Sequence, residues 1–444
     1  MNTLQVGFSR VNITPPLGIG LRGYFRKRYA EGVLDELEAS CLCFACEDTK
    51  VIVMTVDHIG VKKDIMLNIR KEVEALTGIP AEAVYIHCTH THTGPFVLAD
   101  SDDKRIQEYY QHFFRKLVDA AVMATQDLQP AKMGYAVGEA KHIAFIRRFF
   151  MKDGPVATNP KLNDPNIIGP VGQVDERVGV LRFDREKDTL LLANFGNHPD
   201  TVGGNSISAD WPGFVRKYTE QAIPGSKCLF FNGAQGDVNH VYRFPQEWEK
   251  RKGYDYENAK RIGRVITGSI LQVYDNMHYV DVDKLSYCHK IAMAPSNRPD
   301  PAQLPEAHRI NDLYLSGKTQ QEILPDVKGM LRTTMIAEAG RMVRLENGPD
   351  YFEMPLSGIA IGPVAFIGIP GEPFAGIGLA LKENEDWALV LPTCLTNGAE
   401  GYFPMMEAYE EGGYEARSSS FKAGIAELII EEGKKILGEM AQKQ

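Results

Sequence analysis

The segment "AVYIHCTHTHTGP", residues 83–95, starts as an apolar run and ends in three histidines and a turn. Its first half is typical of a buried strand, and Gly94-Pro95 stops that strand. Helical periodicity flanks the segment on both sides, over 63–77 and 104–126. A strand placed between two helices predicts an α/β fold, in which ligand sites commonly lie at strand ends.

The same alternation continues along the chain. Further strands are predicted at 51–57, 177–183, 190–196, 227–233, 359–371 and 387–395, and further helices at 211–222, 256–275, 325–346, 374–383 and 417–440. We therefore expect mixed sheets with flanking helices in one domain spanning 1–444. The polar, proline-containing segment 296–325 is either a lid or insertion within that domain or a boundary.

Composition limits the possible partners. The chain has 444 residues and a formal charge of −9, which argues against nucleic acid or an anionic membrane as a partner. Neither a secretory signal nor a spanning apolar stretch is visible, so we expect no stable membrane insertion. Seven cysteines, an odd number, fit reduced thiols and a cytoplasmic location. The expected partner is a small molecule; the oligomeric state is left open.

The histidine cluster has two interpretations by itself. In an extended strand Cys88, His90 and His92 share one side and His87 faces the other. Two imidazoles at a strand end suit a metal or an acid/base pair, but they equally suit a hydrogen-bonded structural pair.

Three other apolar strands end in a possible ligand. "NFGNHPD" (194–200) supplies His198, "FNGAQGDVNH" (231–240) supplies Asp237, and "IGIPGEPF" (367–374) supplies Glu372. Two histidines and a glutamate with one open position form a known catalytic zinc shell. The competing interpretation of Glu372 is a capping acid for the helix after Pro373.

Together these stretches resemble the neutral/alkaline ceramidases, a family of zinc-dependent amidases. The resemblance rests on "HTHTGP", "NHPDTVGGNSISADWPG", "GAQGDVN" and "IPGEPF", and on the opening "VGFSRVNITPPLGIGLRGY" and "VDERVGVLRFD". These motifs occur in order over nearly the whole chain.

The resemblance implies a zinc site and a mechanism of metal-assisted hydrolysis. Zinc ligands would be His90, His198, Glu372 and Tyr402, the last in "NGAEGY" (397–402). His92 would stand beside the metal and contact the reacting carbonyl or the leaving group. Tyr409 lies in a stretch that matches the family's acidic-tyrosine elements.

The chain departs from the family where the motif "GDVSPN" would place a catalytic serine. Here "GDVNHV" has Asn239, whose amide can still donate to an oxyanion. Family members are exported and carry a C-terminal immunoglobulin-like domain, and the sequence shows neither feature. We therefore expect a short member in which the metal chemistry is kept and the ceramide substrate is not.

Three acids are candidates for orienting a ligand or the substrate, and each has an ordinary alternative. Asp237 is a partner for a ligand histidine or a turn acid. Asp57 and Asp210 are orienting groups or strand-end and capping acids. Arg147 and Arg148 recognise an anionic substrate group or form surface ion pairs.

The sequence therefore predicts a zinc-dependent hydrolase that cleaves an N-acyl amide bond of a small, fairly polar substrate. Ester or lactone hydrolysis on the same metal, a true ceramidase, and a catalytically silent ligand-binding protein are the alternatives.

Overall fold

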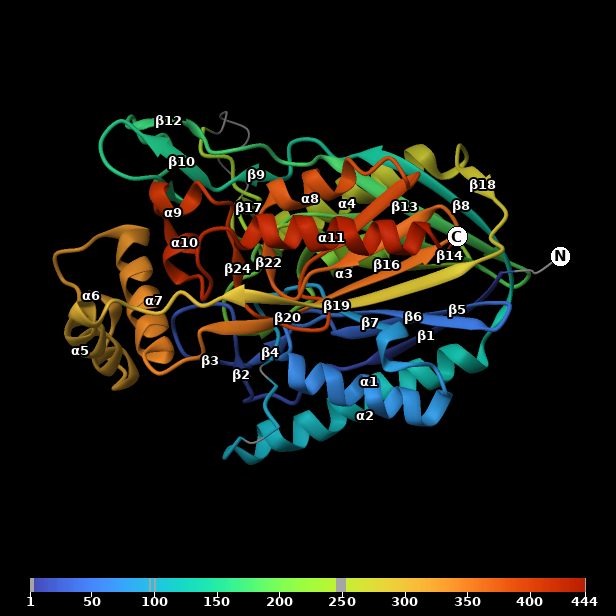
Figure 1. The fold of residues 1–444 in the computed structure, drawn as a ribbon, viewed down its shortest axis with the longest axis horizontal. Helices are drawn as coiled ribbons and strands as arrows, with labels where there is room; N and C mark the ends of the chain where they lie inside the picture. The colour runs from blue at the N-terminus through green and yellow to red at the C-terminus, as the bar shows by residue number, and fades with distance from the viewer. Residues whose placement is uncertain (1–3, 96, 100, 245–252, 444) are drawn as a thin grey trace.

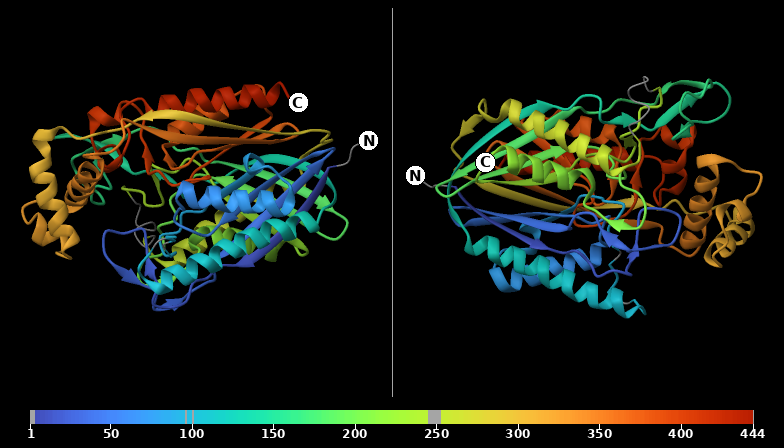
Figure 2. Two further views of the ribbon diagram at one scale, coloured as in Figure 1. Left: turned by 60° about the horizontal axis from the view of Figure 1, so that its bottom comes forward. Right: turned by 180° about the vertical axis from the view of Figure 1, so that it is seen from behind.

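A computed structural model describes residues 4–95, 97–99, 101–244 and 253–443. Two sheets face each other between layers of helices (Figures 1 and 2). The larger has nine strands, eight of them in the order β16-β14-β13-β8-β1-β5-β6-β7, with β18 paired to β8. The smaller has the order β19-β20-β21-β23. The predicted α/β fold with mixed sheets and flanking helices is confirmed.

The strands of the larger sheet are mostly antiparallel, with a parallel pair at each end of the order above, β14–β16 and β6–β7. Its strands are β1 (Gln5–Asn12), β5 (Glu38–Cys46), β6 (Thr49–Val56), β7 (Val84–Cys88), β8 (Gln129–Glu139), β13 (Arg177–Arg185), β14 (Thr189–Phe195), β16 (Ser226–Asn232) and β18 (His278–Val280). β5 holds Cys41, Cys43 and Cys46, and all seven cysteines of the chain are free and buried.

The smaller sheet consists of β19 (Leu285–Pro295), β20 (Tyr351–Ile361), β21 (Val364–Gly368) and β23 (Leu389–Thr393). β21 and β23 are parallel, and the other pairs are antiparallel. Phe366 of this sheet meets Tyr85 and Phe231 of the larger sheet, with ring centroids 6.1 and 6.0 Å apart. The main hydrophobic core therefore lies between the two sheets.

Helices cover the outer faces. α1 (Lys63–Thr77) and α2 (Lys104–Gln126) have the predicted bounds; with α3 (Asp210–Ala222) and α4 (Tyr256–Tyr274) they pack on the larger sheet. α11 (Ile425–Ala441) covers the smaller sheet (Figure 2). α2 buries Phe113, Leu117 and Ala121, spaced one helical turn apart, which gives it one apolar face. No helix in the described ranges has the length and apolarity to cross a membrane.

Two predicted elements were wrong. The run 359–371 is not one strand: Gly362 has φ +50° and turns the chain from β20 into β21. The predicted helix 417–440 is divided into α10 (Tyr414–Ser418) and α11, with Gly424 in a left-handed conformation between them. Gly362 lies inside an apolar run, where periodicity gives no signal of a turn, whereas Gly424 follows the mostly polar residues 417–423.

The segment 296–325 is the first part of the connection 296–350 between β19 and β20, two strands that pair directly. It contributes α5 (Leu304–Leu315) and α6 (Gln320–Ile323), which pack with α7 (Gly329–Leu345) around Ile310, Ile336 and Met342. These helices project at one end of the molecule (Figure 1). By topology the segment is an insertion into a hairpin; its action as a lid stays a prediction, as does the single-domain assignment.

Candidate functional site

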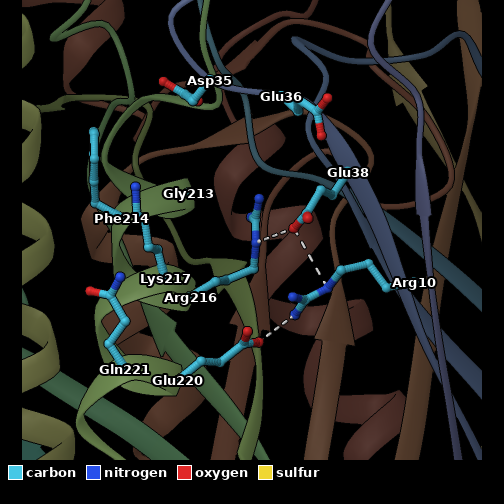
Figure 3. Close-up of a pocket in the computed structure, with 10 residues that line it drawn as sticks. All are labelled: Arg10, Asp35, Glu36, Glu38, Gly213, Phe214, Arg216, Lys217, Glu220 and Gln221. Carbon is cyan, nitrogen blue, oxygen red and sulfur yellow. Dashed lines mark hydrogen bonds and ion pairs between the residues drawn. The ribbon is translucent and has the colours of Figure 1, made fainter.

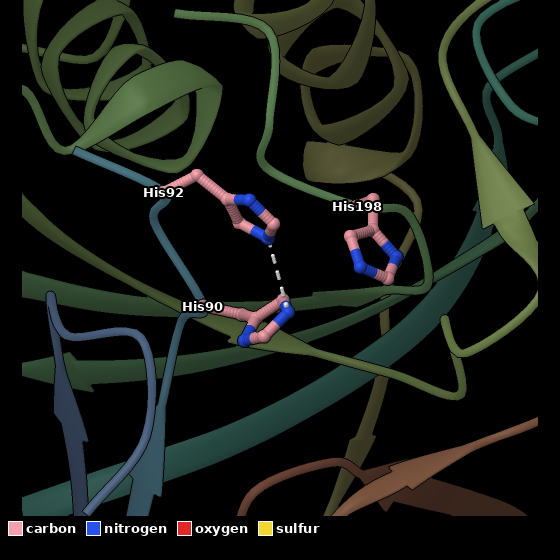
Figure 4. Close-up of side chains that lie close together, drawn as sticks. All are labelled: His90, His92 and His198. Carbon is pink, nitrogen blue, oxygen red and sulfur yellow. Dashed lines mark hydrogen bonds between the residues drawn. The ribbon is translucent and has the colours of Figure 1, made fainter. Parts of the chain in front are cut away.

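Three pairs of parallel strands direct the candidate residues to one place. His90 and His92 follow β7, His198 follows β14, and Glu372 follows β21. The partners of these strands are β6, β16 and β23. Parallel strands end at the same edge of a sheet, so residues far apart in sequence meet there. Figure 4 shows His90 and His92 on one segment and His198 on another, with the three rings close together.

The strand that carries the histidine cluster is shorter than predicted. β7 ends at Cys88, and His90 has a left-handed φ of +78°. Strand alternation is therefore not what brings His90 and His92 together. The strained turn does so, and strain of this kind in a residue other than glycine is concentrated at functional sites. His87 is buried in the core as predicted, where its Nε2 accepts from Asn232 N at 3.0 Å.

Backbone carbonyls orient two of the histidines. His90 Nδ1 lies 2.6 Å from Ile59 O, and His198 Nδ1 lies 2.9 Å from Gln235 O. A carbonyl only accepts, so each Nδ1 carries the proton and each Nε2 presents a lone pair to the site. This arrangement is common for histidines that ligate metals.

Glu372 stands at the centre of the group. Its Oε2 is 3.2 Å from His90 Nε2 and 3.4 Å from His198 Nε2. Two ligands each about 2.05 Å from a tetrahedral ion are separated by about 3.3 Å. These two distances therefore fit ligands of one small cation. Glu372 does not cap the helix after Pro373: the N-cap of α8 (Ala375–Lys382) is Phe374, with no side-chain cap.

Tyr402 is held next to Glu372 by the backbone. β22 (Glu372–Pro373) and β24 (Tyr402–Phe403) form a short parallel ladder in which these two residues are partners. A Cβ on Gly371 would lie 2.5 Å from Gly401 O, so this approach needs a glycine there. Burial and the Glu372 carboxylate raise the pKa of Tyr402 well above its ordinary value, while Arg147 lowers it.

The other pKa shifts arise within the same group. Burial opposes protonation of His90, yet the Glu372 carboxylate raises the pKa of His90 above its ordinary value. Burial opposes ionisation of Glu372, yet His90 and His198 hold the pKa of that carboxyl well below its ordinary value. The pKa of His198 is lowered, first by burial and then by Arg147. A carboxylate stabilised by its neighbours is a suitable anionic ligand for a cation.

His92 is the third histidine of the group. Its Nε2 lies 3.2 Å from His90 Nε2, and the possible ligand atoms of His90, His92 and His198 all lie within 4.8 Å of one another. These three buried histidines could hold a metal ion by themselves. His92 Nδ1 is buried without a hydrogen-bond partner among the described residues. Burial, and secondly His90, lower the pKa of His92 well below its ordinary value. Two ligand sets are thus possible, and both contain His90 and His198. One is completed by His92, and the other by Glu372 and Tyr402.

Arg147 lies inside the site, so the predicted surface ion pair is wrong for this residue. Its Nε donates to Glu415 Oε1 at 2.7 Å in a pair that is almost completely buried. The guanidinium lies 5.4 Å from the ring centroid of Tyr402. Arg148 is also buried, and it donates to Gly412 O at 2.8 Å.

Gln235 and Asp200 belong to the site but were not predicted. Besides its carbonyl contact with His198, Gln235 places its Nε2 3.4 Å from Glu372 Oε2. Asp200 Oδ1 lies 3.1 Å from His240 Nδ1. Both residues occupy the quoted strand-end motifs, "GAQGD" and "NHPD". Each stands two residues from a predicted candidate, Asp200 from His198 and Gln235 from Asp237, and this was the available signal.

Asn239 is buried in β17 (Val238–Asn239). Its Oδ1 accepts from Val241 N at 3.0 Å, and its side chain also interacts with the hydroxyl of Tyr254. The amide at the position of the family's serine is therefore enclosed by the protein.

The remaining candidates make other contacts. Asp237 Oδ1 accepts from Ala375 N at 2.7 Å, at the start of α8. Asp57 forms a bidentate ion pair with Arg216 at 2.9 and 2.5 Å. Asp210 Oδ2 accepts from Val202 N at 2.8 Å, and Tyr409 donates to Phe421 O at 2.7 Å. These contacts are those of capping and structural groups.

A cavity of about 1040 Å³ opens beside the site. His92, His198, Arg147 and Tyr402 lie on its inner wall, while Tyr24, Phe25 and residues of the insertion such as Tyr314 and Lys318 line the rest. The lining is rich in arginine, lysine and tyrosine. Leu21, Phe25, Ile106, Leu315 and Met330 add apolar surface to the same lining.

A second pocket, of about 430 Å³, lies between β1 and α3 (Figure 3). Arg10 Nη2 lies 2.8 Å from Glu220 Oε1, and Arg10 Nε lies 3.5 Å from Glu38 Oε2. The same Glu38 oxygen lies 3.4 Å from Arg216 Nε. Its charged groups neutralise one another, which is typical of a structural ion-pair network.

Comparison with solved structures finds the same fold in ceramidases. Neutral ceramidase from Pseudomonas aeruginosa matches with a TM-score of 0.73 and 15% identity, over 100% of this chain and 75% of that one. A ceramidase complexed with C2 also matches with a TM-score of 0.73. Its sequence identity is 16%, and the match covers 100% of this chain and 76% of that one. No family model and no curated protein matches the chain. The expected resemblance is confirmed at the level of the fold.

Proposed function

We propose that this chain, which has the fold of the neutral ceramidases, is a member of that family and a zinc-dependent hydrolase. It cleaves an N-acyl amide bond of a small, fairly polar substrate. One observation carries the proposal: Glu372 Oε2 lies 3.2 and 3.4 Å from the Nε2 atoms of His90 and His198. That spacing matches two edges of a tetrahedral ligand set.

His90, His198, Glu372 and Tyr402 would hold the ion. When bound, zinc would lower the pKa of water toward about 7 and polarise a substrate carbonyl. Nitrogen and carboxylate ligands suit zinc, whereas calcium and magnesium prefer oxygen alone. The phenol of Tyr402 has a raised pKa here, so Arg147 and the cation would share the task of stabilising its anion.

The other side chains would bind and orient the substrate. His92 lines the cavity and would exchange a hydrogen bond with a carbonyl or a leaving amine. Asn239 would supply a second donor to an oxyanion. Tyrosines and basic groups on the cavity wall would bind the polar groups of the substrate. The free, buried cysteines support a cytoplasmic location.

Hydrolysis of an N-acyl amide, an ester and a lactone, each with and without a chelator, tests the proposal. Chelator-sensitive cleavage of the amide, restored by zinc, is expected. Cleavage of the ester or lactone alone would replace the amidase proposal with esterase or lactonase activity. Bound zinc without cleavage of any of the three would make the chain a ligand-binding protein.

A further inference from the structure

The wall of the cavity beside the metal site is basic, although the whole chain has a formal charge of −9. Its charged lining residues are Arg22, Arg26, Lys27, Arg28, Arg147 and Lys318, against Asp103 and Asp200. A recess lined by one sign of charge attracts ligands of the opposite sign. The excess of positive charge here is local and does not follow from composition.

Both acids of the lining already have partners. Asp103 accepts from the backbone N of Arg105 at 2.9 Å and from its Nη2 at 3.2 Å. Asp200 Oδ1 lies against His240 Nδ1. These carboxylates therefore do not neutralise the basic residues of the wall.

Two of the basic groups also have partners in the protein. Arg147 is paired with Glu415. Arg28 is buried and donates to the carbonyl oxygens of Gly204, Arg22 and His92, each at 2.6 Å. Arg28 thus fixes the loop 22–28 to the segment that carries His92.

Arg22 also interacts within the protein, and three further charges lie at the mouth of the cavity. Arg26, Lys27 and Lys318 are exposed, and the ion pairs of the described residues include none of them, although the charge of Lys318 acts on Glu322. They come from two segments that are joined side by side. The rings of Phe25 and Tyr314 are 6.2 Å apart, and Tyr314 donates to Phe25 O at 3.4 Å.

A row of aromatic rings links this mouth to the metal site. Tyr402 meets Tyr414 with centroids 5.6 Å apart, and Tyr414 meets Phe25 at 6.1 Å. Phe25 precedes Arg26 in the chain, so the row runs from Tyr402, the strand partner of Glu372, to the segment that carries Arg26 and Lys27. A ligand that reached both places would have its anionic group far from the bond at the metal.

We infer that the substrate amide carries a carboxylate or phosphate at the end distant from the scissile bond, and that Arg26, Lys27 and Lys318 bind this anionic group. The inference rests on the proposed hydrolase function. It assigns to the insertion, through Lys318, a share in choosing the substrate.

Matched probes test the inference. N-acetyl-6-aminohexanoate carries its carboxylate on the amine side, and N-hexyladipamate carries it on the acyl side; each is compared with its neutral carboxamide. Binding is measured by calorimetry and cleavage by product release, using the full chain loaded with zinc. The variants are the triple charge reversal R26E/K27E/K318E and K318E alone. Lys71→Glu, an exposed position on α1 outside the cavity lining, is the matched control.

At low ionic strength we expect at least one anionic probe to bind and react about tenfold better than its carboxamide, a preference that salt weakens. The triple reversal should abolish the preference, K318E should reduce it, and K71E should leave it unchanged. If each anionic probe and its carboxamide are bound equally well and cleaved with equal kcat/KM, the inference is overturned and the proposed hydrolase function stands. Preferential binding of the acid without cleavage of either would instead overturn the hydrolase. Capture of the protein by phosphatidylglycerol vesicles, lost in the triple reversal, would assign the charges to a membrane surface and also overturn the inference.

Discussion

Glu372 and Tyr402 are partners in the two-residue ladder between β22 and β24, so the backbone fixes the distance between two proposed ligands. Glu372 N donates to Gly401 O at 2.8 Å, and Leu395 N donates to Gly371 O at the same distance. The site is thus preorganised by strand pairing before any ion binds. This relationship makes the contribution of each side chain testable without disturbing the fold.

Tyr402→Phe removes the phenol but keeps the ring that packs against Tyr414. We expect amide hydrolysis to fall about 100-fold, the loss found when one electrostatic group of an active site is removed. Steady-state kinetics at saturating zinc measure the effect. Tyr409→Phe is the control, since it loses a hydrogen bond to Phe421 O worth about 1 kcal/mol and should retain full activity. Equal activity of the two variants would remove Tyr402 from the site.

His92→Gln distinguishes the two overlapping ligand sets. If His92 contacts the substrate, kcat/KM falls at least 100-fold, a typical effect of losing an acid/base group, and zinc content is unchanged. The measurement pairs kinetics with zinc content by mass spectrometry. His112→Gln, at an exposed position on α2, serves as control. Loss of zinc in His92→Gln would show that His92 is a ligand.

Asp57→Asn removes the buried, bidentate partner of Arg216 and leaves it only the more exposed Glu38. The free energy of unfolding should drop by about 3–5 kcal/mol, while the folded protein keeps its zinc and its activity. Denaturant unfolding measures the loss. Glu38→Gln, which removes a half-exposed partner of the same arginine, should cost less than about 1 kcal/mol. Unchanged stability with lost activity in Asp57→Asn would give Asp57 a role in the site.

Asp237→Asn tests a pH dependence of stability. Burial raises the pKa of Asp237 to about 6 from its ordinary 3.8. Because the folded state holds this proton more tightly than the unfolded state, the protonated group stabilises the fold below pH 4. That stabilisation is lost as the pH rises through about 6, and it amounts to about 3 kcal/mol. Asparagine keeps the acceptor for Ala375 N and does not ionise.

The difference in Tm between the variant and the wild type should therefore shift in favour of the variant as the pH rises from 4 to about 6. Above pH 6 this difference should stay constant. Thermal unfolding of both proteins from pH 4 to 8 measures this. Parallel curves over the whole range would mean that Asp237 ionises normally in the folded protein.

The sequence predicted much of the fold because many strands are continuous apolar runs. β6, β7, β14 and β16 were placed within two residues, and α1 and α2 at their observed bounds. β8 and β19 were missed, since polar residues at alternate positions weaken the apolar signal. The turn at Gly362 was missed because glycine interrupts an apolar pattern without changing it.

In the site, the candidate side chains were easier to predict from the sequence than the backbone and side-chain groups that orient them. The proposed ligands stand at strand ends, where sequence motifs are visible. The groups that orient the histidines are the carbonyls of Ile59 and Gln235, which leave no side-chain signature. The buried pairing of Arg147 with Glu415 joins distant parts of the chain, and local patterns carry no information about such a pair.

The metal content of the purified chain tests the central claim most directly. After incubation with zinc and removal of free ion, mass spectrometry should find one zinc per chain in the wild type. His90→Ala and Glu372→Gln should lose it, while His112→Gln should keep it. A wild-type chain without bound zinc, or His90→Ala and Glu372→Gln chains that hold as much as the wild type, would contradict the account.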